Sequence, residues 1–315
     1  MTTTMTYCEY IEYWDNFLNK WNKDHEDFVR NNPSGQAFFP KDSTGNCIQT
    51  DLYKNVTCMP EPYYFGSDFL NATDWSDFKD AAVVLDLNPG LSHNSDYRKT
   101  KGTHTHDILD DLAIGSYSTT INPKYSPFIS TNPTIPGVTW WKSKRLGWLN
   151  RFLQQGNIRD KVFAFELCPF HSKSWNVKLD SNSIDFVKDY VLDPVVSILA
   201  GNGKKRLGFC FGKDWENVLN ILGFQEVAQW GIDYDCPGKP FVSPAGSELK
   251  QENWIEKGAG PANRIYKLYQ GNIKGKEIYL LCLRAWGTFV APSKEFMKVE
   301  EKIKEDLKNL YSISL

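Results

Sequence analysis

The sequence predicts an α/β protein with a central, mainly parallel, four-stranded sheet that is flanked by helices on both faces. Four short apolar runs lie at residues 82–87, 162–167, 206–211 and 277–283, and segments with helical periodicity alternate with them. Strands that are apolar throughout are typical of parallel sheets covered on both faces. The intervening helices provide the crossover connections that parallel strands need.

The first predicted element is an amphipathic helix near the N-terminus, where apolar residues from Tyr10 to Trp21 recur every three or four positions. The polar stretch after it, punctuated by Gly and Pro, predicts a connector, and PEPYYFG at residues 60–66 predicts an extended, proline-rich turn. We therefore expect residues 1–59 to form a helical extension with a connector, and residues 60–315 to form the domain that contains the sheet.

Four further helices are predicted from the same periodicity, at residues 143–155, 183–199, 214–222 and 293–310. The first three separate the strands, and the last follows the fourth strand. The segment from residue 91 to residue 127 is long for a connection and rich in Ser, Thr, Asn, Tyr and His. It forms either the wall of a ligand pocket or a disordered insertion.

Composition limits the classes of function. The formal net charge of the 315 residues is −2, so the molecule as a whole is not an obvious polyanion binder. A local basic groove remains open, formed by Lys142, Lys144, Arg145 and Arg151 or by residues 204–206, although such clusters are more often solvated faces. The 11 Trp residues suit either a large core or a surface that stacks bases.

We expect a cytoplasmic monomer with reduced thiols and without a metal or cofactor. The seven cysteines include no Cys-x-x-Cys pair, and His104 and His106 lack a third ligand nearby in sequence. The N-terminus does not resemble a signal peptide, and no apolar run is long enough to span a membrane.

Polar residues follow the ends of the predicted strands. The strand ends read Asp86-Leu87-Asn88-Pro89-Gly90, then ELCPFH at residues 166–171, then Gly212-Lys213, and last Arg284-Ala285-Trp286. Ligands of open α/β sheets bind beyond the carboxyl ends of the strands. These side chains are therefore the candidates for a functional site.

The ordered set of motifs resembles the uracil-DNA glycosylase superfamily, and most closely its single-strand-selective monofunctional and mismatch-specific branch. The matching stretches are PEPYYFG, LNPG, FELCPF, FGKDW and APS, which occur in this order from residue 60 to residue 293. The resemblance implies an enzyme that flips a nucleotide out of DNA and hydrolyses its N-glycosidic bond. It places Pro89, Gly90 and His171 in the base pocket, and it places the DNA contacts at Pro62, Lys213, Pro292 and Ser293.

Two residues of the first motif carry the predicted chemistry. The resemblance implies that Asn88 orients the attacking water through its amide oxygen, although a plain turn amide is the alternative. Asp86 replaces the glycine of the family motif and lies two residues earlier, on the same face of an extended strand. It either assists as a base or electrostatic partner, or it is a buried aspartate satisfied by loop amides.

Glu166 replaces the asparagine that reads uracil in the family. An ionised glutamate only accepts hydrogen bonds, so it suits the exocyclic amino group of cytosine, whereas a protonated Glu166 would still fit uracil. This difference and the long loop predict a modified cytosine as substrate. Because the superfamily that the sequence resembles includes bacterial defence enzymes that attack hypermodified cytosines in phage DNA, the resemblance implies a base such as glucosylated 5-hydroxymethylcytosine and a role in bacterial antiphage defence. The alternatives are an ordinary uracil or mismatch glycosylase and a catalytically inactive DNA-binding sensor.

The histidine of the family's last motif is missing, because Ala291 stands before the Pro-Ser pair. Its task of stabilising the leaving base falls to Arg284, Trp286 or His171, of which we choose Arg284; a phosphate or structural contact is the other reading of that arginine. Phe128 is the candidate for the aromatic that stacks on the base, with Tyr97 and Tyr125 as substitutes.

Overall fold

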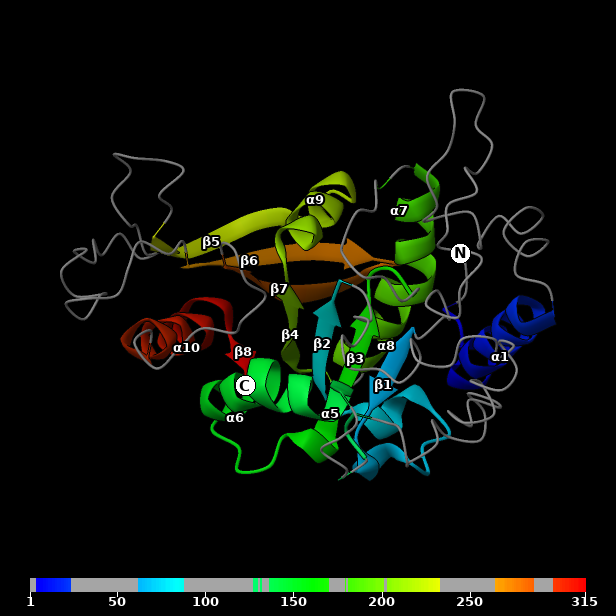
Figure 1. The fold of residues 1–315 in the computed structure, drawn as a ribbon. Coiled ribbons are helices and arrows are strands. Elements are labelled where there is room, and N and C mark those ends of the chain that lie inside the picture. The colour runs from blue at the N-terminus through cyan, green and yellow to red at the C-terminus, as the bar shows by residue number, and fades with distance from the viewer. Residues whose placement is uncertain are drawn as a thin grey trace.

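The computed structural model describes residues 4–23, 62–87, 127–129, 131, 136–169, 179, 181–200, 203–232, 264–285 and 297–315. Within these residues the protein is an α/β structure with one eight-stranded mixed sheet (Figure 1). The strands are β1 (Tyr63–Phe65), β2 (Ala82–Asp86), β3 (Val162–Glu166), β4 (Lys205–Phe211), β5 (Gln225–Ile232), β6 (Arg264–Ile273), β7 (Lys276–Ala285) and β8 (Ile313–Ser314).

The four predicted strands form the centre of this sheet. They are β2, β3, β4 and β7, and they lie next to one another in the order β3-β2-β4-β7 with every pair parallel. In chain order this is second, first, third, fourth. The order reverses between β2 and β4, which is the topological switch point where ligands of doubly wound sheets bind.

The predicted sheet of four strands was too small. Strand β1 pairs antiparallel with β3 at one edge, where the sequence had predicted only an extended turn. At the other side β6 pairs antiparallel with β7, and β5 pairs antiparallel with β6. The two-residue turn between β6 and β7 consists of Lys274 and Gly275, with φ of 50° and 84°, which is the backbone that tight hairpin turns require. Strand β8 pairs with the start of β4.

The predicted helices are present with shifted ends. They are α1 (Tyr7–Lys23), α5 (Pro136–Trp141), α6 (Gly147–Leu153), α7 (Ser181–Val187), α8 (Asp193–Leu199), α9 (Lys213–Ile221) and α10 (Met297–Tyr311). Two π-helical turns, η5 (Lys142–Leu146) and η7 (Lys188–Leu192), join α5 to α6 and α7 to α8. Short 3-10 helices lie at η2 (Ser67–Phe69), η3 (Trp75–Phe78) and η6 (Arg159–Lys161).

Helix α1 begins with a reciprocal cap. The backbone N–H of Thr6 donates to Glu9 Oε2 at 2.7 Å, and the N–H of Glu9 donates to Thr6 Oγ1 at 3.3 Å. This satisfies N–H groups that have no partner inside the helix. The apolar face of α1 then packs Tyr10 and Trp14 into the same core as Tyr63 of β1.

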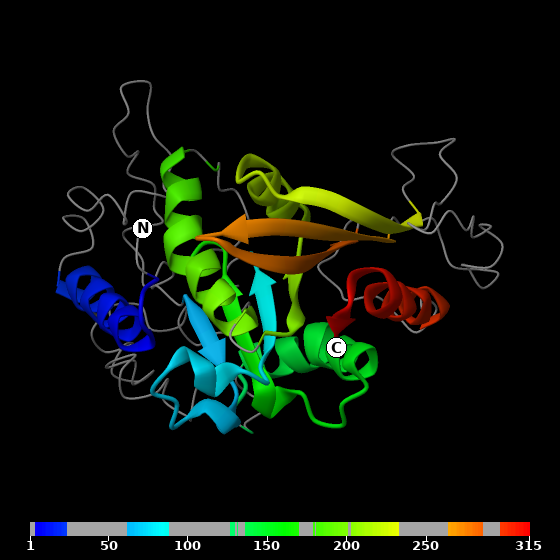
Figure 2. The same ribbon diagram turned by 180° about the vertical axis from the view of Figure 1, so that it is seen from behind.

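Two apolar cores cover the two faces of the sheet. One contains Leu85 and Phe165 with side chains of α1, α7, α8 and α9, and the other contains Val84 and Phe209 with side chains of α5, α6 and α10. Alternate residues of each strand supply the two cores, as the pleat requires. Figure 1 shows α5 and α6 in front of the parallel strands, and Figure 2, from behind, shows α7 and α8 crossing them.

Candidate site at the carboxyl ends of the parallel strands

Asp86 and Glu166 are neighbours at the carboxyl ends of β2 and β3. They are register partners in the parallel pair, so their side chains project from the same face of the sheet. On the other side of β2, Leu85 is opposite Cys210 of β4, so the next residues of the two strands, Asp86 and Phe211, are also opposite each other. Phe211 is in turn opposite Leu283 of β7, and the four side chains form a row across the four parallel strands. This row lies on the face covered by α5 and α6 and extends across the switch point.

Asp86 forms a buried ion pair with Arg145 of η5. The Nε of Arg145 donates to Asp86 Oδ2 at 3.1 Å, and Nη2 donates to Oδ1 at 3.2 Å. The two side chains are 1% (Arg145) and 7% (Asp86) exposed, so water screens the pair weakly. Two parallel hydrogen bonds fix both the distance and the orientation of the guanidinium relative to the carboxylate.

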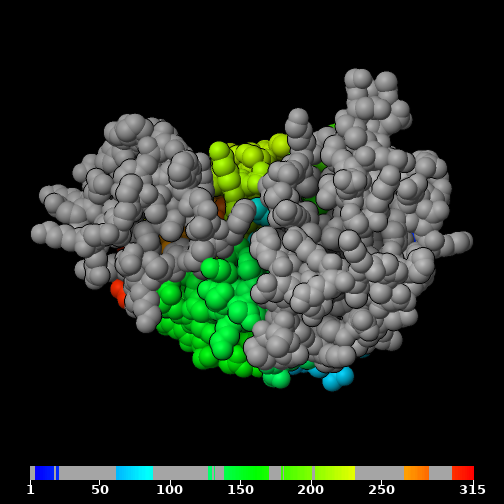
Figure 3. All heavy atoms as spheres, in the orientation of Figure 1, coloured from blue at the N-terminus to red at the C-terminus, as the bar shows by residue number. Residues whose placement is uncertain are grey.

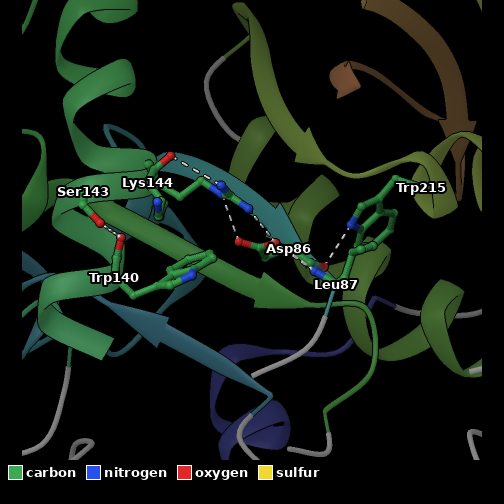
Figure 4. Close-up of polar contacts among 7 residues, drawn as sticks. Asp86, Leu87, Trp140, Ser143, Lys144 and Trp215 are labelled. Carbon is green, nitrogen blue, oxygen red and sulfur yellow. Dashed lines mark hydrogen bonds and ion pairs between the residues drawn. The ribbon is translucent and has the colours of Figure 1, made fainter. Parts of the chain in front are cut away.

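The guanidinium of Arg145 also contacts two aromatic rings. Its central carbon is 4.3 Å from the ring centre of Phe211 and 4.6 Å from that of Trp140. Arg145 itself belongs to the π-helical turn, and such turns occur frequently at functional sites. Figure 4 shows Trp140 extending from its helix toward the end of the strand that carries Asp86.

The backbone around Asp86 is also held firmly. Its carbonyl oxygen accepts from the N–H of Leu167 at 3.0 Å and from the indole Nε1 of Trp215 at 2.9 Å, as the dashed line to Trp215 in Figure 4 shows. The N–H of Leu87 donates to Asp86 Oδ1 at 3.1 Å, and the carbonyl of Leu87 accepts from Cys168 at 2.8 Å. The chain is therefore fixed up to the residue that immediately precedes Asn88.

Gly212 brings the end of β4 against the end of β2. Its φ is +114°, and a Cβ built there would lie 2.8 Å from Leu87 Cδ1. Only glycine therefore fits without strain and displacement. Lys213, a predicted DNA contact, follows as the first residue of α9 and is exposed.

The buried ion pair corrects the expectation of a basic groove at residues 142–151. Arg145 does not face solvent, and Arg151 binds Glu300 of α10 through two hydrogen bonds of 2.9 and 2.8 Å. The hydrogen bonding to Glu300 raises the pKa of Arg151 above its ordinary value. Of the four cations, Lys142 is exposed and Lys144 is half-buried.

The partners of the Asp86 carboxylate that the structure describes are the guanidinium of Arg145 and the backbone N–H of the adjacent Leu87. The loop amides of the alternative interpretation, from residue 88 on, lie outside the described residues.

Glu166 is 3% exposed and ends β3. Its backbone N–H donates to the carbonyl of Pro62 at 3.0 Å, so Pro62, which the resemblance assigned to DNA, is a buried residue directly behind this strand end. Phe128, the predicted stacking aromatic, is 1% exposed and contacts Trp141 edge-on at 4.8 Å between ring centres. The ring centre of Phe128 also lies 6.3 Å from that of Tyr64.

Several predicted site residues lie outside the described part of the chain. They are Asn88, Pro89, Gly90, His171, Pro292 and Ser293, together with the further candidates Tyr97, His104, His106, Tyr125, Trp286 and Ala291. Arg284 is described by its backbone alone, which pairs with Ile265 near the end of β7.

Sequence reasoning missed three residues of this site: Trp140, Arg145 and Trp215. A signal existed for Arg145, because it falls four residues after Trp141 and four before Leu149, on the apolar side of the predicted helix. A cation in that position is expected to have a buried carboxylate partner. No comparable local pattern identifies the bond between Trp215 and Asp86.

The fold and this site define an α/β protein with a buried carboxylate pair at the carboxyl ends of β2 and β3, of which β2 borders the switch point of the sheet. No protein-family model, curated protein or solved structure matches the chain. Among the described residues, no three His, Cys, Asp or Glu side chains are grouped so that they could hold a metal ion. The described helices include none with the length and apolar character needed to cross a membrane.

Proposed function

We propose that this protein is a monofunctional DNA glycosylase that flips a modified base out of DNA and hydrolyses its N-glycosidic bond, leaving an abasic site. The observation that supports this most is the pair of buried carboxylates, Asp86 and Glu166, side by side at the carboxyl ends of the adjacent parallel strands β2 and β3. This is where an open α/β sheet binds its ligand. Asn88, the proposed water-orienting residue, follows Asp86 by two positions.

Glu166 is the proposed base-reading residue. A carboxylate accepts from the exocyclic amino group of cytosine, whereas it meets only like polarity at the corresponding carbonyl of uracil. The proposed substrate is therefore a modified cytosine such as glucosylated 5-hydroxymethylcytosine in phage DNA. The enzyme would meet such DNA in the cytoplasm, in the course of antiphage defence.

Asp86 is proposed to act electrostatically. Arg145 donates to both of its oxygens, and these two hydrogen bonds fix the position and orientation of the carboxylate. Its fixed negative charge beside the site would favour the positive charge that develops on the sugar as the bond breaks. Arg284 is proposed to stabilise the negative charge of the leaving base.

The test is base release measured by mass spectrometry from DNAs that contain uracil, cytosine, 5-hydroxymethylcytosine or its glucosylated form. The wild type should release a modified cytosine, and Asn88→Ala should lose turnover while keeping its affinity for DNA. Glu166→Gln gains a donor on its amide, so its preference should shift from the modified cytosine toward uracil. A mismatched hydrogen bond of this kind costs about 1–3 kcal/mol, which is roughly a 5- to 150-fold change in selectivity.

Two results would redirect the proposal. Release of uracil alone would refute the role of Glu166 while retaining a glycosylase. DNA binding without release of any base would favour the second candidate, a catalytically inactive sensor. The ion pair with Arg145, which reduces the negative field of Asp86 at the site, and the alanine at position 291 are the observations that favour that candidate.

A further inference from the structure

Trp140 is an aromatic side chain that faces solvent beside the candidate site. It is 37% exposed, although most tryptophans described in the structure are buried in the cores. It lies in α5, and the helical segment 136–153 reaches the molecular surface in green in Figure 3. An exposed indole at the ligand-binding edge of a sheet calls for a physical explanation.

The indole of Trp140 is held in position by its contacts with Arg145 and Trp141. The guanidinium of Arg145 lies over the ring of Trp140, with 4.6 Å between its central carbon and the ring centre, and the same carbon is 4.3 Å from the ring centre of Phe211 in the sheet. Asp86 prevents the guanidinium from turning, because it accepts two of its hydrogen bonds. Trp141 also contacts Trp140 edge-on at 5.4 Å. A ring held in this way loses little conformational entropy when a ligand binds to it.

The charge around Trp140 favours an anionic ligand. The helical segment 136–153 contains four cations and no Asp or Glu. Arg145 and Arg151 are bound to carboxylates inside the molecule, whereas Lys142 is exposed and Lys144 is half-buried. The positive charge offered to solvent by this segment therefore lies two and four residues after Trp140.

We propose that Trp140 is a stacking platform for an unpaired nucleobase of the DNA strand, with Lys142 and Lys144 at the backbone phosphates on either side of that nucleotide. An aromatic ring combined with flanking cations is the usual means of binding single-stranded nucleic acid without reading its sequence. The proposal rests on the proposed function in taking DNA as the ligand. It adds a contact beyond the base pocket, because Trp140 lies outside the row of Asp86 and Glu166.

The test is fluorescence anisotropy with a labelled single-stranded oligothymidylate, which contains no excisable base. Trp140→Ala should bind about 5- to 100-fold more weakly than the wild type, and Trp140→Phe should lose less. The matched control is Leu310→Ala, which removes an apolar side chain of 49% exposure from α10 and should bind like the wild type. Thermal unfolding of each variant establishes that the fold is kept.

Salt dependence separates stacking from charge. Trp140→Ala should leave the slope of log affinity against log salt unchanged, whereas the double variant Lys142→Ala/Lys144→Ala should reduce it by about 1.4, or about 0.7 for each phosphate contact. Wild-type affinity for the oligothymidylate in Trp140→Ala, or an equal loss in Leu310→Ala, would overturn the platform. Equally tight binding of thymidine monophosphate would also overturn it, because the site would then be one for free nucleotides.

The outcomes also separate this inference from the proposed function. If the oligothymidylate binds through Trp140 and no base is released from any modified DNA, the platform stands and the glycosylase proposal fails. If bases are released and Trp140→Ala binds normally, the glycosylase proposal stands and the platform is refuted.

Discussion

Removing Arg145 tests whether its ion pair with Asp86 organises the site. Arg145→Met keeps an unbranched apolar side chain of similar length and leaves the carboxylate, whose side chain is 7% exposed, without its guanidinium. Loss of one partner of a buried ion pair costs about 3–5 kcal/mol, because an uncompensated charge stays in the interior. The free energy of unfolding, measured by urea titration with tryptophan fluorescence, should fall by this amount.

The double variant Asp86→Asn/Arg145→Met provides the control. It removes both charges, so it should be more stable than Arg145→Met alone, and the two single changes should not be additive. Two results would refute the reasoning. Either Arg145→Met costs less than about 1 kcal/mol, or the double variant loses the full sum of the two single losses.

Three further predictions concern the scaffold. Gly66→Ala should lower the free energy of unfolding, measured with urea, by about 1–3 kcal/mol, because its Cβ would lie 2.2 Å from a backbone carbonyl oxygen of η6. The control is Gly156→Ala, whose Cβ would have no atom within 4 Å, and its free energy of unfolding should stay within about 0.5 kcal/mol of the wild type. Glu300→Gln should lower the free energy of unfolding by about 1–3 kcal/mol, because this buried carboxylate accepts hydrogen bonds from the indole of Trp148 and the guanidinium of Arg151. The control is Glu301→Gln at the exposed neighbouring position, which should change the free energy of unfolding little. Hydrogen bonds from the backbone N–H groups of Thr73 and Asp74 lower the pKa of Asp77 in the folded state below its ordinary value of 3.8. The ionised carboxylate therefore stabilises the fold above pH 3.8, and this stabilisation is lost as the pH falls through the folded-state pKa. Asp77→Asn should therefore lose less stability than the wild type between pH 5 and pH 3 in the same assay.

The parallel centre of the sheet was predictable because burial on both faces leaves a continuous apolar run in the sequence. Strands β2 and β3 were predicted to within a residue at each end. Strand β6 was missed because its residues alternate between core positions such as Tyr266 and Leu268 and more exposed positions such as Lys267 and Gln270. A sequence search for runs alone overlooks such a strand, although alternation and the turn at residues 274–275 are readable signals.

The site was predictable only in part. Asp86 and Glu166 were identified because the ends of parallel strands meet at one edge of the sheet, and that argument needs only the strand positions. The partner of Asp86 could not be identified, because Arg145 is 59 residues away and belongs to a basic stretch that resembles a solvated face. Pairing between distant elements depends on how the helix packs on the sheet, which local sequence does not encode.

The tight turn between β6 and β7 has a consequence for how the chain folds. These two strands are adjacent in sequence and connected by two residues with positive φ, so they can form a β-hairpin in about 1–10 μs. The strand that carries Asp86 is expected to pair much more slowly, because its partners β3 and β4 begin only at Val162 and Lys205, far along the chain. Closing such long loops dominates the folding time. The antiparallel pair β6 and β7 is therefore expected to form first, and the edge of the sheet that carries Asp86 and Glu166 to be among the last parts of the chain to become ordered.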